Sequence, residues 1–250
     1  MNGGFSGKTI LVTGASSGLG EACAAYLDKQ GAQLVLVARN ERKLDMMVSS
    51  FNKAIALPGD FYNPSCVDGI FAQIDNKQLC LDGVVHCAGI APDIPVSQYS
   101  YDEALGIFNV NFFSFCSIIK YCSRKKYMNR GGSIVAISSL SVLRGNKAQA
   151  SYVASKSALE GYVGIAAKEL LEKQIRVNAV APGALDTPMT DRAFTASPMA
   201  KENINSVQRL GLIDTTVLAR LIGFLLSDDA CYMTGLTIPV DAGSLLSTGI

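Results

Sequence analysis

The chain has 250 residues, of which 49% are hydrophobic and 17% are charged. This balance provides for a sizeable buried core and excludes an intrinsically disordered chain. The 22 basic and 21 acidic side chains nearly cancel, which argues against a protein that holds nucleic acid by bulk positive charge.

The beginning of the chain, MNGGFSGKT, contains no apolar segment like the core of a signal peptide. No uninterrupted apolar run reaches the ~18 residues that a membrane-spanning helix needs. We therefore expect a cytoplasmic protein that has no membrane segment. Seven cysteines are an odd number, and none of them forms a C-x-x-C pair, so the sequence predicts buried free thiols in a reducing compartment.

The single histidine, His86, restricts the chemistry further. A zinc site needs several His and Cys ligands at motif spacing, which this sequence does not offer, and we expect no metal. His86 ends the apolar run DGVVHCAG. That position is more typical of a structural residue at a strand end than of a catalytic base.

Apolar runs and helical patterns alternate through the whole chain. The predicted strands cover residues 8–14, 33–39, 54–60, 81–89, 132–139, 175–183 and 236–243. The predicted helices cover roughly residues 20–31, 40–51, 64–76, 100–128, 151–173 and 216–228, and the fourth is interrupted near NVNFF. Strands that are apolar on both faces indicate a parallel sheet covered by helices on both sides. We predict one α/β domain over residues 1–250, with a doubly wound seven-stranded sheet and a site at the carboxyl ends of its strands.

Residues 184–208 do not follow this alternation. They form a polar, proline-containing segment that is too long for a simple connection, and we predict a mobile lid over the site. Met189, Phe194 and Met199 lie in this segment. They would either line an apolar substrate pocket or pack against the body of the protein.

The stretch TGASSGLG, residues 13–20, has two interpretations. Read as G-A-S-S-G, it matches the nucleophile elbow of hydrolases. Read as G-x-x-x-G-x-G, with Gly14, Gly18 and Gly20, it is a glycine-rich turn that lets a pyrophosphate approach bare backbone. A hydrolase triad would need His86 and an acid such as Asp60 from adjacent early strands, which would leave most of the chain without a role. We therefore favour the glycine-rich turn, whose serines would cap the next helix and donate to phosphate.

Further motifs follow this turn in order: HCAG at 86–89, NVNFF, ISSLS, YVASK, APGALDTPM and TGLTIPVDAG. With them the chain resembles the short-chain dehydrogenase/reductase family over nearly its whole length. It is similar to the single-domain type that includes the 3-oxoacyl-acyl-carrier-protein reductases. The resemblance implies a Rossmann-like fold and a reversible NADP-dependent oxidoreductase that interconverts a carbonyl and a secondary alcohol.

The resemblance also implies a catalytic tetrad of Asn111, Ser139, Tyr152 and Lys156. Tyr152 would exchange the proton, Ser139 would hold the substrate oxygen, and Asn111 would order a water that relays protons from Lys156. Lys156 would in addition hold the nicotinamide ribose. Tyr152 and Lys156 lie four residues apart at the start of a helix and share one face. An ammonium there is expected to lower the phenol pKa from its usual ~10.

Three polar neighbours compete with the tetrad for these roles. Ser138 and Ser141 flank Ser139, and Asn109 lies two residues before Asn111. The spacing to Tyr152 favours Ser139, and the family's asparagine follows a valine. We therefore interpret the three neighbours as structural residues.

Cofactor contacts follow from the same resemblance. Asp60 matches the aspartate that meets the adenine, and the P-G of APGALDTPM matches the motif beside the nicotinamide. The implied contact residues are Gly14, Ser16, Ser17, Gly18, Leu19, Gly20, Arg39, Asp60, Phe61, Ala88, Gly89, Tyr152, Lys156, Pro182, Gly183, Leu185 and Thr187. One departure is HCAG, where the family usually has N-N-A-G. Cys87 cannot replace the sheet-stabilising asparagine well, so we expect a loss of local stability but not of catalysis.

The end of the second predicted strand bears on the choice between NADP(H) and NAD(H). An Asp or Glu there would bind the ribose 2′-hydroxyl and repel a 2′-phosphate. This chain has Ala38 followed by Arg39, and a guanidinium can fork onto phosphate oxygens. We therefore expect NADP(H) to be preferred. The competing interpretation is that Arg39 pairs with Glu41 or Asp60.

The last expectations concern partners. We predict a homotetramer because the two long helical segments carry apolar residues on more than one face. These residues are Phe112, Phe113, Phe115, Tyr162, Val163 and Ile165. Arg130 and Lys173 fall where similar reductases place bases for an acidic carrier protein, although a base near a helix C-terminus also complements the helix dipole. The substrate is then a free small molecule or a carrier-bound acyl chain. A non-catalytic dinucleotide-binding sensor or scaffold is the alternative to an enzyme.

Overall fold

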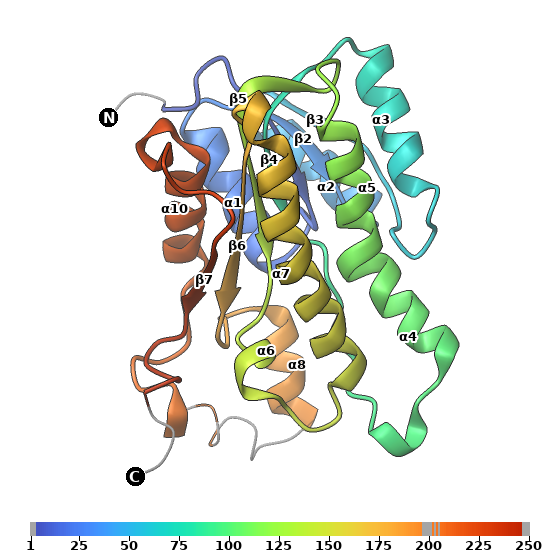
Figure 1. Cartoon of the computed structure of the whole chain (residues 1–250), viewed down its shortest axis with the longest axis vertical. Coiled ribbons are helices and arrows are strands. Elements are labelled where there is room, and N and C mark those ends of the chain that lie inside the picture. The colour runs from blue at the N-terminus through green and yellow to red at the C-terminus, as the bar shows by residue number, and fades with distance from the viewer. Residues whose placement is uncertain (1–3, 197–201, 203, 205, 247–250) are drawn as a thin grey trace.

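Figure 1 shows the computed structural model, which describes residues 4–196, 202, 204 and 206–246. Its seven strands form a parallel sheet in the order β3-β2-β1-β4-β5-β6-β7. The strands are β1 (Thr9–Thr13), β2 (Gln33–Val37), β3 (Ala54–Ala56), β4 (Leu81–His86), β5 (Met128–Ile137), β6 (Arg176–Pro182) and β7 (Thr237–Val240). The predicted doubly wound, seven-stranded fold is confirmed.

Helices cover both faces of the sheet. One face packs against α3 (Cys66–Asn76), α5 (Ser114–Cys122) and α7 (Ala150–Leu170) through a core that includes Phe71, Phe115 and Leu159. The other face packs against α1 (Gly18–Lys29), α2 (Glu41–Ser50) and α10 (Thr215–Leu226). The remaining helical elements are η1 (Val96–Gln98), α4 (Tyr101–Phe108), η2 (Asn109–Phe113), α6 (Ser141–Arg144), η3 (Leu171–Lys173), α8 (Pro188–Ala196) and η4 (Asp228–Ala230).

The helix predicted over residues 100–128 is divided in the structure. It consists of α4, the π-helical turn η2 and α5, and it ends at Cys122, because Met128 already pairs with Leu81 in the sheet. The run Tyr101–Cys122 is long and apolar enough to span a membrane by length and composition alone, with a mean hydropathy of 1.3. This corrects the expectation that no such stretch exists. Half of that window is buried inside the fold, as in the core helix of a globular domain.

The chain adds strands on one side of β1 first and changes to the other side after β3. It adds β2 and β3 on one side of β1 and then crosses over to place β4 on the other. In open α/β sheets the loops at such a switch point separate and leave a crevice at the carboxyl ends of the strands. The glycine-rich turn follows β1 and HCAG follows β4, so both predicted motifs lie at this crevice.

Candidate active site

The turn after β1 leaves no room for side chains at its glycines. Gly14 (φ 65°) and Gly18 (φ 53°) have left-handed backbone conformations, which glycine adopts most readily. A Cβ on Gly20 would collide with the carbonyl oxygen of Gly14, so the start of α1 packs directly onto the turn. The positive end of a helix that begins on bare backbone suits a diphosphate. This cradle fits the dinucleotide that the sequence implies.

The serines of the turn differ from expectation in one respect. Ser17 occupies the N-cap position of α1, with φ −160°, but its side chain forms no capping hydrogen bond. The predicted capping role is therefore wrong for Ser17. Its exposed hydroxyl lies at the start of the helix, where the phosphate-binding role stays a prediction.

The structure brings the four predicted catalytic residues together at the switch-point edge. Asn111 lies in η2, Ser139 follows β5, and Tyr152 and Lys156 are in the first turns of α7. Gly89, just after β4, lies between two of them. A Cβ on Gly89 would be 3.4 Å from Lys156 Nζ and 3.5 Å from Asn111 Oδ1. A Cβ there would be in ordinary van der Waals contact with both side chains, so Gly89 marks the place where they approach each other.

Asn111 is fully buried and fixes the main chain around the site. Its Oδ1 accepts a hydrogen bond from the Ile90 amide (2.8 Å), and its Nδ2 donates to the Ile90 carbonyl (3.0 Å) and to Ser155 Oγ (3.0 Å). The predicted kink at Asn111 is confirmed as a π-helical turn, a distortion often found at functional sites. Asn109 instead donates to the Tyr62 carbonyl, 3.2 Å away, outside this cluster.

The Tyr152 hydroxyl lies near Ser139. Burial raises the pKa of the Tyr152 phenol above its ordinary value, and the neighbouring Ser139 hydroxyl lowers it in part. The expected lowering of this pKa by Lys156 is not found. Lys156 Nζ donates to the carbonyl oxygen of Ile137, 2.7 Å away.

Lys156 is 4% exposed. Burial lowers the pKa of its ammonium to about 8, and Cys87 acts weakly in the opposite direction. The side chain is thus still charged at neutral pH, but it loses its proton more readily than an exposed lysine does. A buried positive charge next to the Tyr152 helix face favours any negative charge that develops there.

The neighbouring polar residues have structural partners. Ser138 donates to Glu160 Oε1 (2.5 Å), and Ser141 Oγ accepts from Asn146 Nδ2 (2.8 Å). Sequence reasoning did not single out Ser155, which is part of YVASK, or Glu160, which follows the motif on α7. Glu160 lies one helical turn after Lys156 and therefore on the same face of α7. This spacing could have predicted that Glu160 lies near the end of β5, where it accepts from Ser138.

His86 is fully buried at the end of β4, as expected of a structural residue. Its Nδ1 lies 3.0 Å from Thr13 Oγ1, and its Nε2 lies 3.4 Å from Ser114 Oγ. Thr13 Oγ1 also accepts from the Ala88 amide, and Ser114 donates its proton to the Val110 carbonyl. Thr13 therefore donates to Nδ1, and the imidazole proton sits on Nε2. Burial and the charge of Lys156 lower the pKa of His86 to about 3, so the ring is neutral.

The cysteines are all free thiols. Only Cys23 and Cys122 are buried, which corrects the expectation that most of them would be. Cys87 is partly exposed beside the glycine-rich turn, and its thiol raises the pKa of the neighbouring Cys23. Within the described ranges, no cluster of three or more His, Cys, Asp or Glu side chains could hold a metal ion.

Arg39 and Asp60, which are predicted to meet the adenosine part of the cofactor, are both exposed. Asp60 Oδ1 accepts a hydrogen bond from the Tyr62 amide (3.1 Å). In the described part of the chain Arg39 has no ion pair and no hydrogen-bond partner for its side chain, so the expected alternative pairing with Glu41 or Asp60 does not form. A side chain held by no other group is available to a phosphate.

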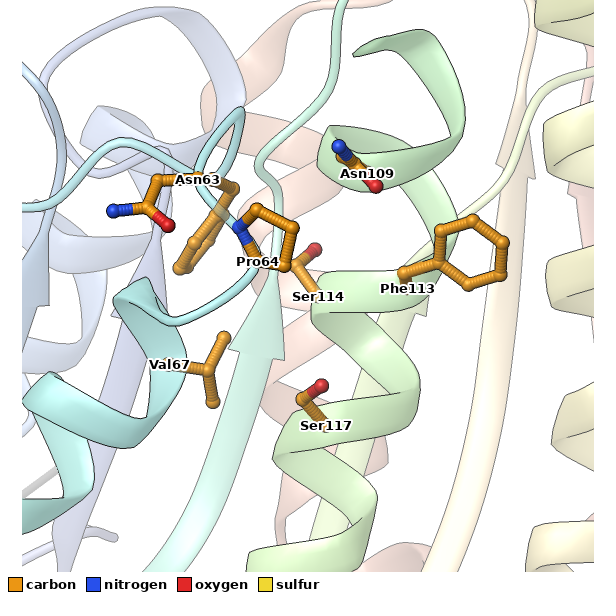
Figure 2. A pocket seen from close by; sticks show the side chains of 8 residues that line it. Asn63, Pro64, Val67, Asn109, Phe113, Ser114 and Ser117 are labelled. Carbon is orange, nitrogen blue, oxygen red and sulfur yellow. The ribbon is translucent and has the colours of Figure 1, made fainter. Parts of the chain in front are cut away.

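A small cavity of about 40 Å³ lies next to this side of the site. Figure 2 shows Asn63, Pro64 and Val67 on one wall, and α5 with the π-turn before it on the other. The lining residues are Phe61, Asn63, Pro64, Val67, Asn109, Phe113, Ser114 and Ser117. This volume suits ordered water rather than a substrate.

The segment after β6 lies over the glycine-rich turn. A Cβ on Gly18 would be 3.2 Å from the methyl carbon of Thr187, so Thr187 lies beside the glycine-rich turn, and its contact with the cofactor stays a prediction. Leu185 forms a parallel bridge with Ile213. The predicted lid, residues 184–208, contains α8, in which Phe194 is partly buried. Met199 lies outside the described residues, and the side chain of Met189 is likewise not described.

The residues predicted to meet partners fall into different environments. Phe115 and Val163 belong to the core, which corrects their assignment to surplus surface, whereas Phe113 and Ile165 are exposed. Arg130 donates to Gln174 Oε1 (3.0 Å) and to the Glu172 carbonyl (3.1 Å). Lys173 donates to the Ser123 carbonyl. Both bases lie at the amino ends of the strands, opposite Ser139, and they satisfy carbonyls near helix ends as the dipole interpretation predicts.

Comparison with known proteins gives a consistent result. The family whose sequence profile matches residues 14–244 is described as enoyl-(acyl carrier protein) reductase. The chain belongs to the short-chain dehydrogenase/reductase family. A 3-oxoacyl-[acyl-carrier-protein] reductase FabG of Pseudomonas aeruginosa is 34% identical over 247 residues, which cover 97% of this chain and 99% of the relative. The FabG of Thermotoga maritima is 33% identical, with 97% and 99% covered.

Solved structures agree with the sequence relatives. The angucycline C-6 ketoreductase LanV with bound NADP has a TM-score of 0.88 at 26% identity, with 98% of both chains covered. A 4-hydroxyisoleucine dehydrogenase complexed with NADH has a TM-score of 0.87 at 28% identity, with 96% of this chain and 99% of the other covered. The protein is an NAD(P)-dependent oxidoreductase that acts on CH–OH groups.

Proposed function

We propose that this short-chain dehydrogenase/reductase uses NADP(H) to interconvert a carbonyl group and a secondary alcohol, with Tyr152 as proton donor and acceptor. The observation that carries this proposal is the placement of the Tyr152 hydroxyl beside Ser139. The pair lies at an edge where buried Lys156 and Asn111 also meet. When bound, the nicotinamide supplies the hydride chemistry.

The residues divide the remaining work. Ser139 donates a hydrogen bond to the substrate oxygen and fixes its position. Tyr152 stays protonated at neutral pH because burial raises its pKa, so it can give its proton to that oxygen during reduction. The buried ammonium of Lys156 stabilises the phenolate left behind. Asn111 holds Ile90 and α7 in place, and the water relay expected from it is part of this proposal.

A panel of ketones and diketones, assayed by the absorbance of the reduced nicotinamide, tests the proposal. Tyr152→Phe removes the proton donor and is expected to lower kcat by ~10²–10⁴-fold, with cofactor affinity nearly unchanged. Tyr162→Phe, on the same helix and partly buried, is the matched control and should keep wild-type rates. Rates in Tyr152→Phe above half of wild type would overturn the role of Tyr152. Cofactor binding without turnover on any carbonyl would instead support a sensor.

Carrier-bound acyl chains are the substrate class that the relatives favour. The similar FabG proteins are named as 3-oxoacyl-[acyl-carrier-protein] reductases, and we extend this substrate class to the present chain as a proposal. The test compares a 3-oxoacyl group on a carrier protein with the same group on a small thiol. A lower KM for the carrier form supports the proposal, and equal KM values contradict it. The cytoplasmic location stays a prediction.

A further inference from the structure

Gln208 closes the base of the segment between β6 and α10. Its side chain is 3% exposed. The amide contacts both main-chain groups of Ala184: Oε1 accepts from the Ala184 amide (2.9 Å) and Nε2 donates to the Ala184 carbonyl (2.8 Å). Nε2 also donates to the Gly211 carbonyl (2.7 Å). The Gln208 side chain thus connects two positions, Ala184 and Gln208, that lie 24 residues apart in the segment between β6 and α10.

The chain leaves space for this amide at one position. A Cβ on Gly183 would lie 2.5 Å from Gln208 Oε1, so only a glycine at 183 lets the amide reach Ala184. Gly183 itself is fixed from the other side, because its amide donates to the Val240 carbonyl (2.8 Å) of β7. The contact is therefore built from two residues, and Gly183 has a structural reason to be glycine beyond the P-G motif.

The segment that Gln208 holds leads directly to the cofactor cradle. After Ala184, the Asp186 amide donates to the Ile213 carbonyl (3.0 Å), and the methyl carbon of Thr187 lies beside Gly18. Residues 184–187 thus run from the Gln208 clamp to the glycine-rich turn without an intervening helix. A displacement of Ala184 would be passed on to Leu185 and Thr187.

We propose that Gln208 is a positioning residue that sets the placement of residues 184–187 against the nicotinamide half of the cofactor. This inference rests on the proposed function, because it takes Leu185 and Thr187 as contacts of the nicotinamide side. In this proposal Gln208 does not itself bind cofactor or substrate but acts through the main chain of Ala184. Among the side chains, only a primary amide presents two donors and an acceptor in one plane, which is what the three contacts require.

Two variants separate this role from general support of the fold. Gln208→Met keeps the length of the side chain but makes none of the three hydrogen bonds. Gln208→Glu keeps the acceptor, loses both donors, and sets a carboxylate against the carbonyls of Ala184 and Gly211. Gln73→Met, at an exposed position on α3, is the matched control. Each protein is titrated with NADPH and with adenosine 2′,5′-bisphosphate, which keeps the adenosine and its 2′-phosphate but lacks the diphosphate bridge and the nicotinamide half.

We expect Gln208→Met to bind NADPH about 5- to 30-fold more weakly, the loss that corresponds to one or two net hydrogen bonds. Its affinity for adenosine 2′,5′-bisphosphate should stay within about twofold of wild type, since this ligand lacks the parts that residues 184–187 are proposed to contact. The affinity of Gln208→Glu for NADPH should be lower still at neutral pH. It should recover as the pH falls through the pKa of the introduced carboxyl, because a protonated carboxyl regains one hydrogen-bond donor. Gln208→Met should show no such recovery.

Three results would overturn the inference. Equal losses for both ligands in Gln208→Met would show a general structural role, and unchanged NADPH affinity in both variants would show no role. A Gln208→Glu variant without pH recovery would exclude the donor requirement. If wild type and the Gln73→Met control bind neither ligand, the proposed function itself fails, which is a different outcome from failure in the Gln208 variants alone.

Discussion

The imidazole of His86 is held by the hydroxyl of Thr13, with 3.0 Å between Nδ1 and Oγ1. Thr13 is the last residue of β1, directly before the glycine-rich turn, and His86 is the last residue of β4. On its other side the ring reaches Ser114, the first residue after the π-helical turn that carries Asn111. His86 therefore connects the cofactor turn to the helix of the tetrad, in a position where the family usually has asparagine.

This arrangement predicts a specific loss of stability in acid. The folded pKa of His86 is about 3, whereas an unfolded histidine titrates near ~6.5. The unfolded chain therefore takes up the proton first, and the free energy of unfolding falls as pH drops from ~6.5 towards 3, by at most ~1.4 kcal/mol per pH unit from this group. His86→Asn removes the titration. Urea unfolding of both proteins at several pH values should show their difference shrinking or reversing in acid.

Because His86 is the only histidine of the chain, no other imidazole contributes to that difference. Thr13→Val serves as a control, since it removes the hydrogen bond to Nδ1 but leaves the titrating ring. It should lower stability at neutral pH and keep the acid dependence. A difference between wild type and His86→Asn that does not change with pH would contradict the neutral, buried imidazole.

Lys156 is expected to weaken the fold while it serves the reaction. Its folded pKa of about 8 lies below the ~10.4 of an unfolded lysine. The charged form therefore costs on the order of 3 kcal/mol when buried at neutral pH, and the free energy of unfolding should rise as pH increases from 8 to ~10.4. Lys156→Met removes this cost. It should unfold at higher urea concentration than wild type at neutral pH and show almost no turnover.

The exposed Lys168 on the same helix provides the control for this experiment. Lys168→Met should change stability little and should leave turnover intact. The advantage of Lys156→Met over wild type should decrease above pH 8, because wild-type Lys156 is then neutral as well. A Lys156→Met protein that is less stable than wild type at neutral pH would refute the buried-charge argument.

Predictability from sequence differs between parts of this molecule. Residues 34–37 of β2 are buried on both faces of the sheet, so an uninterrupted apolar run identifies this strand directly. The tetrad can be recognised because its residue types occur at the spacing typical of the family. The prediction that the fourth helix reaches Met128 was wrong. The helix ends at Cys122, and Met128 pairs with Leu81 from a distant part of the chain. Gln208 gave no signal at all. Its partner Ala184 is 24 residues away, and no local pattern identifies a single glutamine as a clamp.

The pKa of Tyr152 illustrates a different limit. Spacing correctly places Lys156 on the same helix as Tyr152, but the direction of its amino group depends on the Ile137 carbonyl of the neighbouring strand. Helical periodicity predicts which residues share a face of the helix. It does not predict which strand packs against that face. Burial of Tyr152 is likewise a property of the assembled site, which is why the shift runs opposite to the one predicted.

Two separate exposed apolar areas favour the homotetramer. One lies on α4, η2 and α7 and includes Tyr101, Phe113 and Ile165. The other lies on α10 and towards the edge strand β7 and includes Phe224 and Tyr232. Two distinct self-complementary patches on one chain generate a tetramer with intersecting two-fold axes. Ile165→Asp and Tyr232→Asp should each reduce the tetramer to a dimer in light scattering, and a monomeric wild type at micromolar concentration would contradict the prediction.

Cofactor preference is expected to depend on Arg39. Ala38 replaces the acid that would repel a 2′-phosphate, and in the described part of the chain no other side chain engages the Arg39 guanidinium. A hydrogen bond to a charged group contributes about 1.5–3 kcal/mol, which corresponds to roughly 10- to 150-fold in preference. Arg39→Ala should therefore lower kcat/KM for NADPH by that factor and leave kcat/KM for NADH nearly unchanged.

Arg42→Ala, at an exposed position at the start of α2, is the control and should keep the preference for NADPH. The decisive measurement compares kcat/KM for NADPH and NADH on one substrate, and equal values or a preference for NADH in wild type would show that Arg39 does not select the phosphate.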